Sequence, residues 1–298
     1  MKVLITGSTS MIGRQVVNKL FNYDLLTPTK EELNLLDFSA VENYFSENKP
    51  NKVIHLGGYN GGLLFNKNFP EEIFFRTTTM GLNVIRSSVL HNVEKIVFIV
   101  PSCALNPDAS EASEDDLYRS QPHPSVECHG LAKRAVEAYG RQSEKQHGIK
   151  FITCVANNSF GPKDRFDEGG KVISGMIQKI YEAKINGDEE VVFWGTGKPL
   201  REFIYCADIA YIIVQLLNKD IPSPIIATSD YEISIYDLAH KIAKIMCYRG
   251  KITFDDSKPD GQMRKKLNSD KMRKYLDVNI TPFDEALSET IDWYMNNV

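Results

Sequence analysis

The first half of the chain alternates short apolar runs with longer stretches in which apolar residues recur at helical spacing. The apolar runs predict strands of a parallel sheet at residues 2–7, 24–29, 52–58, 94–102 and 150–158. The longer stretches predict helices at residues 11–23, 39–49, 69–92 and 125–148, the second of them capped by Ser39. Strands and helices in this order build right-handed βαβ units. The pattern therefore predicts an α/β fold with a doubly wound parallel sheet.

The regular alternation of predicted strands and helices ends after residue 160. Loops rich in Gly, Asp and Glu are expected at residues 161–170 and 186–190. Short predicted strands, "VVFWG", "PIIATS" and "KITFDD", mix with predicted helices at residues 208–219, 234–247 and 282–296. We therefore predict a Rossmann domain over 1–160. A smaller C-terminal α/β lobe over 161–298 would mainly bind substrate and be partly interleaved with that domain.

Composition narrows the class of protein. The chain has 298 residues and a formal net charge of -4, which argues against nucleic acid as its main partner. No apolar run approaches the roughly 20 residues that span a bilayer, and "MKVLITG" enters a strand without the form of a signal peptide. Five cysteines without a CxxC pair, and histidines without ligand spacing, argue against a metal site or disulfide framework. A cytoplasmic protein is expected.

A glycine-bearing turn, "TGSTSMIG" at residues 6–13, lies between the first predicted strand and helix. Such a turn lets backbone N–H groups and the helix N-terminus approach a pyrophosphate. Ser10 stands where a middle glycine is usual, so a plain strand–helix turn is the alternative. The residues predicted to hold the cofactor are Gly7, Ser8, Thr9, Ser10, Met11, Ile12 and Gly13.

The end of the second predicted strand bears on the choice of cofactor. An acidic residue there would bind the ribose 2′-hydroxyl of NAD, but the chain has Thr27, Pro28 and Thr29. Lys30 follows at once and favours a 2′-phosphate, so NADP(H) is the predicted cofactor. The alternative is that Lys30 is a solvated residue.

Several longer motifs carry a family resemblance. They include "EELNLLD", "GGLLFN", "FGPKDRF", "VVFWGTGKPLREFIYCADIA" and "KITFDDSKPDGQMRKK". The chain resembles extended short-chain dehydrogenases/reductases that act on nucleotide sugars, and most of all the GDP-L-fucose synthase family. The resemblance implies an NADPH-dependent 3,5-epimerase/4-reductase of a GDP-4-keto-sugar. It also implies a homodimer that pairs the helices predicted at 69–92 and 125–148.

The resemblance also implies roles for individual residues. Asp37 would bind the adenine amino group, and Lys133 the nicotinamide ribose. The residues implied for the GDP-sugar are Asn158, Lys171, Trp194, Arg201 and Lys265. Arginine suits a diphosphate because its planar fork makes paired hydrogen bonds. The alternatives are that Trp194 is core and that Arg201 pairs with Glu202 or Asp208.

The chain departs from the family at the proton donor. The family has a Tyr–x–x–x–Lys pair on one helix face, but "ECHGLAKR" at 127–134 places His129 four residues before Lys133. Imidazole can act as a general acid, since its ordinary pKa is near 6.5. The neighbouring Lys133 would lower that pKa and leave the ring neutral. His129 is therefore either a direct or water-relayed proton donor, or it only packs and catalysis is impaired.

Two further catalytic positions depart from the family pattern, and a third, the cysteine, is present. In "PSCALNP", either Pro101 or Ser102 stands at the family's serine, and we choose Ser102 because only it has a hydroxyl. The resemblance makes Cys103 an epimerisation base, for which a thiol is suited in a positive site. Lys171 stands at the family's second epimerisation residue, a histidine, although it could be a surface lysine at a helix start.

These residues favour an NADPH-dependent reductase of a GDP-4-keto-hexose or heptose, with altered or lost epimerase activity. One alternative is a nucleotide-sugar epimerase that retains its cofactor. The other is a nucleotide-sugar-binding homologue without efficient catalysis.

Overall fold

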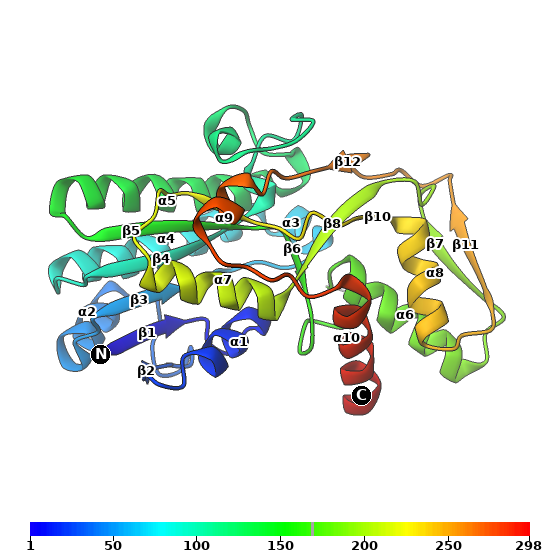
Figure 1. Cartoon of the computed structure of the whole chain (residues 1–298), viewed down its shortest axis with the longest axis horizontal. Helices are drawn as coiled ribbons and strands as arrows, with labels where there is room; N and C mark the ends of the chain where they lie inside the picture. Colours follow the sequence, from blue (N-terminus) through cyan, green and yellow to red (C-terminus); the bar gives the residue numbers. More distant parts are fainter. Residues whose placement is uncertain (168–169) are drawn as a thin grey trace.

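A six-stranded parallel sheet forms the centre of the molecule, which confirms the predicted α/β architecture (Figure 1). The computed structural model describes residues 1–167 and 170–298, so residues 168 and 169 of the loop expected at 161–170 lie outside the described residues. The strands follow the order β2 (Asp24–Leu26), β1 (Lys2–Thr6), β3 (Lys52–His55), β4 (Lys95–Pro101), β5 (Lys150–Ala156) and β9 (Ile225–Ala227).

Helices cover both faces of this sheet because alternate side chains of each strand point to opposite faces. Val3 and Ile5 of β1 pack in a core with α1 (Met11–Lys19) and α7 (Cys206–Asn218). Leu4, between them, packs in the core on the other face. That second core includes residues of α2 (Phe38–Asn48), α4 (Pro70–Leu90) and α5 (Glu127–His147). A short helix, α3 (Leu63–Asn68), precedes α4.

Two predicted details of the first half are wrong. The first helix ends at Lys19 rather than near residue 23, because Leu20 already has non-helical dihedral angles. The second helix is capped by Asp37 and not by Ser39. Asp37 has extended backbone angles, and its side chain accepts a hydrogen bond from the backbone N–H of Ala40 at 3.1 Å. An N-cap needs that geometry, whereas Ser39 lies inside the helix.

The second half builds a smaller lobe on the right of Figure 1. Strand β8 (Leu200–Tyr205) is central to it and pairs with β6 (Asn158–Phe160), β10 (Glu232–Ser234) and β12 (Arg264–Lys265). Strands β7 (Glu190–Trp194) and β11 (Lys251–Asp255) form a separate pair. The helices of this lobe are α6 (Val172–Asn186), α8 (Ile235–Ile245) and α10 (Phe283–Asn297). Helix α9 (Asp270–Tyr275) instead packs against β9 of the central sheet.

The second half of the chain contributes more to the central sheet than the predicted order of strands and helices indicates. The run "PIIATS" does not belong to the small lobe, because its residues Ile225–Ala227 form β9 and pair with β5 in the central sheet. Helix α7 also lies against the central sheet, where it packs against α1. Between β4 and α5 the chain passes through 3₁₀ turns at Ser102–Ala104, Glu114–Tyr118 and Pro124–Val126.

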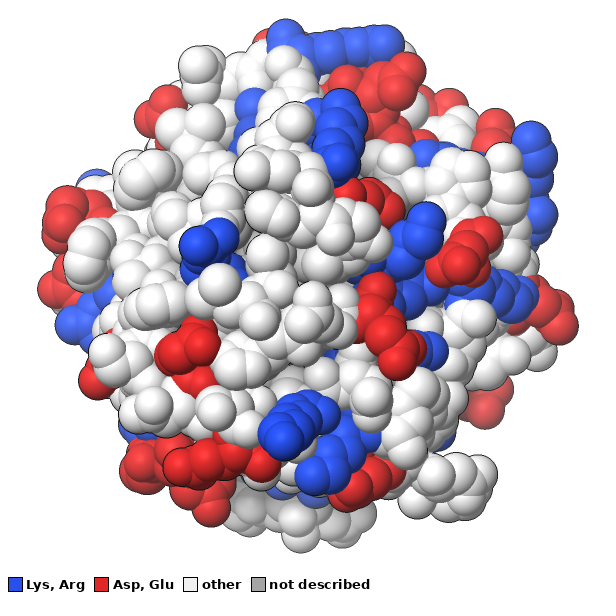
Figure 2. All heavy atoms as spheres, turned by 90° about the vertical axis from the view of Figure 1, so that its left-hand side faces the viewer, with Lys and Arg blue, Asp and Glu red and all other residues white. Residues whose placement is uncertain are grey.

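The left-hand end of Figure 1 carries the amino ends of the central strands. Seen from that side, Lys and Arg side chains are interspersed with Asp and Glu side chains (Figure 2). The described part of this face therefore carries no large single-sign patch that would attract a polyanion. Among the described residues, no helix is long and apolar enough to cross a membrane.

Candidate active site

A cavity of about 730 Å³ lies at the carboxyl ends of the central strands, which is where open α/β sheets bind their ligands. Its walls come from the glycine turn, the end of β4, the first turns of α5, the segment after β5 and strand β8. Predicted site residues on these walls are Thr9, Ser10, Met11, Ile12, Ser102, Cys103, His129, Lys133, Asn158, Lys171 and Arg201. The structure therefore brings part of the predicted cofactor residues and part of the predicted substrate residues to one space.

The glycine turn has the geometry that a pyrophosphate requires. Gly7 has a φ of +74°, which favours glycine. A Cβ on Gly13 would lie 2.2 Å from the carbonyl oxygen of Gly7, so only glycine lets α1 start against the turn. Ser10 is the N-cap of α1: its hydroxyl accepts from the N–H of Gly13 at 3.1 Å and donates to the Gly7 carbonyl at 2.8 Å. Ser10 therefore closes the turn at the position where a glycine is usual, and the turn fits a dinucleotide.

Lys133 is buried at the base of the cavity. Its ammonium donates to the carbonyl of Gly57 at 3.4 Å and lies 4.7 Å from the centroid of the Phe98 ring. Burial lowers the pKa of Lys133 to about 8, and nearby Cys103 opposes that shift. A partly desolvated cation at this position suits ribose hydroxyls and an adjacent developing negative charge.

His129 lies one helical turn before Lys133, as the spacing predicts, and is 7% exposed. Its Nδ1 is 4.0 Å from the Sγ of Cys103, so imidazole and thiol are in hydrogen-bond contact. Burial, with a smaller effect of Lys133, lowers the pKa of His129 to about 3. The ring is therefore neutral at pH 7, as expected from the sequence.

Ser102 is buried and its hydroxyl donates to Oδ1 of Asn157 at 3.3 Å. Nδ2 of Asn157 donates in turn to Glu202 Oε2 at 3.0 Å. Glu202 is 0% exposed and also accepts hydrogen bonds from the Thr228 hydroxyl and the Leu267 N–H. This network joins the predicted catalytic serine, at the end of β4, to the strand that carries Arg201.

The raised pKa of Glu202 predicts a pH-dependent stability. Burial, with the charges of Asp230 and Glu232, raises that pKa to about 6 from 4.5. The folded chain then keeps a proton that the unfolded chain releases, so stability falls as pH rises from 4.5 to 6. The loss amounts to about 2 kcal/mol in the free energy of unfolding. In Glu202→Gln it should be absent, as urea unfolding at pH 4.5 and pH 7.5 would show; an unchanged pH dependence would contradict the assignment.

Lys171 occupies the N-cap position of α6, yet its side chain reaches the cavity. Its ammonium donates to the carbonyl and hydroxyl oxygens of Ser159 at 3.3 and 3.1 Å, and lies 3.9 Å from Asp164. Burial raises the pKa of Asp164, which Lys171 opposes. The alternative that Lys171 is a lysine at a helix start is correct for its position. It does not account for the contact of its side chain with the cavity.

The predicted substrate residues divide between the cavity wall and other places. Arg201 lines the cavity and donates to the Leu200 carbonyl at 2.7 Å; the alternative of a pair with Glu202 or Asp208 is wrong, because those carboxylates bind other groups. Asn158 lines the cavity beside it. Lys265 is half-buried on β12 and registers with Arg201 across the sheet.

Besides Lys265 and the turn residues Gly7, Ser8 and Gly13, the predicted residues Trp194, Lys30 and Asp37 are absent from this wall. Trp194 is 76% exposed at the end of β7, so the alternative that it is core is wrong. Lys30 is exposed with its ammonium 3.6 Å from Glu31, and Asp37 caps α2. None of the three is among the residues that line the described cavity.

Sequence reasoning missed the polar residues that support the site. Asn157 binds Ser102, and Glu202 binds Asn157, only because the fold brings them together. No local spacing in the chain predicts either contact. Lys163, Asp164 and Arg165 line the cavity as well, and the motif "FGPKDRF" contained them. The motif carries a family resemblance, but no role was predicted for these three residues.

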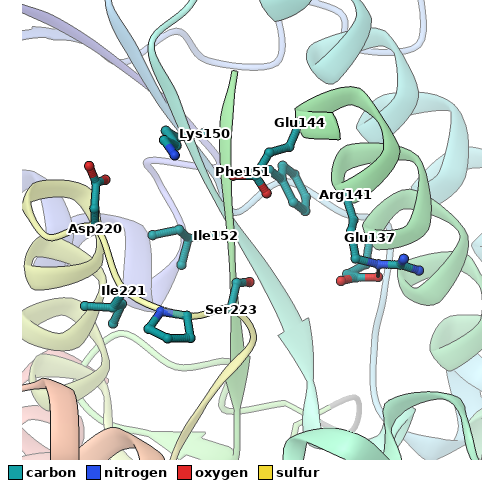
Figure 3. A pocket seen from close by; sticks show the side chains of 10 residues that line it. Glu137, Arg141, Glu144, Lys150, Phe151, Ile152, Asp220, Ile221 and Ser223 are labelled. Carbon is teal, nitrogen blue, oxygen red and sulfur yellow. Dashed lines mark ion pairs between the residues drawn. The ribbon is translucent and has the colours of Figure 1, made fainter. Parts of the chain in front are cut away.

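A second cavity, of about 400 Å³, lies at the opposite end of β5 (Figure 3). Helix α5 contributes Glu137 and Arg141, whose charged atoms are 3.7 Å apart, and β5 contributes Lys150 and Ile152. The loop at 220–223 closes it. It is remote from the glycine turn and takes no part in the site described above.

A Rossmann sheet whose glycine turn and buried lysine open into one cavity defines a nicotinamide-dependent oxidoreductase of the short-chain dehydrogenase/reductase class. A model of the NAD dependent epimerase/dehydratase family matches residues 3–228. The GDP-L-fucose synthase of Dictyostelium discoideum is 33% identical, over 99% of this chain and 95% of that protein. The chain belongs to the NAD dependent epimerase/dehydratase family and, within it, to the GDP-L-fucose synthase family.

Solved structures agree with this placement. A GDP-L-fucose synthetase from Naegleria fowleri bound to NADP is 28% identical, with a TM-score of 0.90 over 99% of this chain and 94% of that one. A GDP-mannoheptose C4 reductase from Campylobacter jejuni with NADP bound is 25% identical, with a TM-score of 0.89 over 99% and 98% of the two chains.

Proposed function

We propose that this chain reduces the 4-keto group of a GDP-linked 6-deoxyhexose or heptose with NADPH. One observation carries the proposal: a single cavity joins the glycine turn, the pair His129–Lys133 and Arg201. A ketone reductase needs a cofactor site, a proton source and a substrate anchor within one such space. The names of the relatives support a GDP-sugar as the substrate and NADP as the cofactor.

The cofactor would be held by residues of the Rossmann half. The turn from Gly7 to Gly13 and the N-terminus of α1 would bind the pyrophosphate, and Lys133 the nicotinamide ribose. Asp37 would accept from the adenine amino group with the carboxylate oxygen that does not cap α2. Lys30, in solvent, would select the 2′-phosphate. When bound, NADPH supplies a hydride to the keto carbon.

The substrate would be held by residues from both halves. Arg201 and Lys265 would meet the diphosphate as a pair of cations, and Asn158 and Lys171 would meet the sugar side. Trp194 would contact the nucleoside from its exposed position on β7. Ser102 would hold the keto oxygen, and His129 would take part in its protonation.

Epimerisation is proposed to be altered or lost. The base and the acid for the carbons next to the ketone would be Cys103 and Lys171, and both reach the cavity. Lysine differs from the family's histidine in charge and reach, so the second proton transfer would not proceed as in the family. A simple epimerase that retains its cofactor is the second candidate, favoured by the presence of Cys103.

The test is turnover of NADPH with GDP-4-keto-6-deoxymannose and with a GDP-4-keto-heptose, followed by loss of the reduced-cofactor absorbance. Reduction of at least one substrate is expected, and NMR of the product would show which carbons were inverted. Failure to reduce either, with NADPH binding shown by calorimetry, would contradict the proposal. Cofactor that stays bound through purification and turns over without net oxidation would favour the epimerase.

We also propose a cytoplasmic homodimer, with residues 1–160 as the main cofactor-binding part and 161–298 as the main substrate-binding part. Helices α4 and α5 lie side by side and would pair with their copies (Figure 1). Phe74 and Phe75 on α4, at 40% and 59% exposed, offer apolar surface for that contact. The five cysteines are all free thiols, which fits a reducing compartment.

A further inference from the structure

The contact between Cys103 and His129 suggests an answer to the missing tyrosine. We propose that Cys103 supplies the proton that reduction places on the sugar oxygen, and that His129 passes this proton on. The inference rests on the proposed reductase function. It is drawn from the 4.0 Å contact between Sγ and Nδ1 and from the place of both side chains on the cavity wall.

His129 alone cannot serve as the donor. Its pKa is lowered to about 3, so the imidazolium form is scarce at pH 7. A neutral imidazole gives up its N–H proton readily only when its second nitrogen takes a proton in the same step. The ring therefore needs a partner on its other side, and Cys103 is that partner.

The same contact fixes the tautomer of the ring. Burial raises the pKa of Cys103, so sulfur keeps its hydrogen and is the donor of the pair. Nδ1 of His129 is then the acceptor, and the hydrogen of the neutral ring resides on Nε2. The Nε2–H group is thus available as the hydrogen-bond donor to a keto oxygen in the cavity.

The step balances without a charged imidazole. The keto carbon receives the hydride, and the π pair of the carbonyl moves to oxygen. The oxygen takes the proton from Nε2, while Nδ1 takes the proton from sulfur. The ring ends as its other neutral tautomer and Cys103 ends as a thiolate. After the alcohol leaves, Nε2 takes a proton from solvent and Nδ1 returns its proton to sulfur, so that both groups recover their first forms.

Three cationic side chains would stabilise the thiolate that this step leaves. Lys265, Arg134 and Lys133 all act to lower the pKa of Cys103 against the effect of burial. Arg134 is held at the same turn, because its Nε donates to the Ala104 carbonyl at 2.6 Å. Removing one proton therefore leaves a negative charge in positive surroundings.

Ser102 is poorly placed to replace the thiol. Its hydroxyl hydrogen is already given to Asn157, and an alcohol is a much weaker acid than a thiol. To hold the sugar oxygen, Ser102 would turn its hydroxyl away from Asn157, whereas Cys103 would supply the proton. Cys103 then acts in reduction, in addition to any part in epimerisation.

The test compares Cys103→Ala with Cys128→Ala. Cys128 precedes His129 on α5, is half-buried and does not line the cavity, so it is a matched control. Cys103→Ala should lower kcat about 100-fold, the usual weight of a general acid. Cys128→Ala should stay within about twofold of the unaltered chain, as a surface-type change does. Calorimetry should show unchanged NADPH binding in both variants.

The solvent isotope effect on kcat tests the proton relay separately from any effect of Cys103 on packing. In mixtures of light and heavy water, kcat of the unaltered chain should follow a curved dependence on deuterium content, because two protons move together. Cys103→Ser, which keeps the volume, should give a low kcat and a linear dependence. Rates for Cys103→Ala and Cys128→Ala that agree, or a linear dependence in the unaltered chain, would overturn the relay while leaving the reductase proposal intact. Absence of turnover by the unaltered chain would overturn both.

Discussion

Replacing Gly13 by alanine is expected to abolish binding of nicotinamide dinucleotides. The new Cβ would lie 2.2 Å from the Gly7 carbonyl oxygen and 2.8 Å from the backbone of Ser8. These are backbone atoms, which cannot rotate away as the end of a side chain can. The turn would have to open, and the N–H groups of α1 would move from the pyrophosphate. Calorimetry with NADPH should show affinity reduced at least about 1,000-fold, the loss expected when several charge-assisted hydrogen bonds fail together.

Gly175→Ala is the matched control for this substitution. Gly175 lies in α6, and a Cβ there would meet nothing within 4 Å. The variant should bind NADPH normally and gain up to about 1 kcal/mol in the free energy of unfolding, since alanine is the better helix former. Normal NADPH binding by Gly13→Ala would show that the turn does not hold the pyrophosphate.

Replacing Lys133 by methionine should lower kcat about 1,000-fold, the scale seen when a preorganised electrostatic group is removed from an active site. The side chain keeps its length and its packing on Phe98, so the fold should survive. What is lost is the positive charge beside Cys103 and the donor that we propose for the nicotinamide ribose. In the unaltered chain, activity that depends on this charge should fall as pH rises through about 8, because the lysine then loses its proton.

Lys145→Met is the control, because Lys145 lies exposed on the same helix. Steady-state kinetics and NADPH calorimetry of both variants would separate the effects on kcat from those on cofactor affinity. Full activity in Lys133→Met would contradict the role given to the buried ammonium.

The sequence predicted the central sheet well because buried parallel strands are nearly continuous apolar runs. One error concerns a cap, where a single side-chain hydrogen bond decides between Asp37 and Ser39. Another is the run "PIIATS", which was predicted in the small lobe but forms β9 of the central sheet. Helix α6 was not among the helices that apolar spacing predicted, although a helix start at Lys171 was considered, because Gly175 interrupts its first turns. Glycine lowers helix propensity, and only packing in the small lobe restores the helix.

The candidate site was predictable where its chemistry is local. The glycine turn and the pair His129–Lys133 each lie within one short stretch of chain. The contact between Cys103 and His129, and the network from Ser102 to Glu202, join residues 26 and more positions apart. A single sequence holds no record of such neighbours. The alternative that Trp194 is core was left open for the same reason, since a large aromatic ring in a sequence does not show whether it faces the core or solvent.

The placement of β9 limits how such enzymes can be recombined. Strand β9 and helix α7 complete the half that carries the glycine turn, although both follow β6 and β8 in the chain. A graft that exchanged everything after residue 160 for another protein's sequence would remove the edge strand and a covering helix from the sheet. An exchange of sugar preference between relatives therefore has to leave residues 206–228 of the recipient protein in place. The exchanged sequence would be two separate segments, one before and one after these residues.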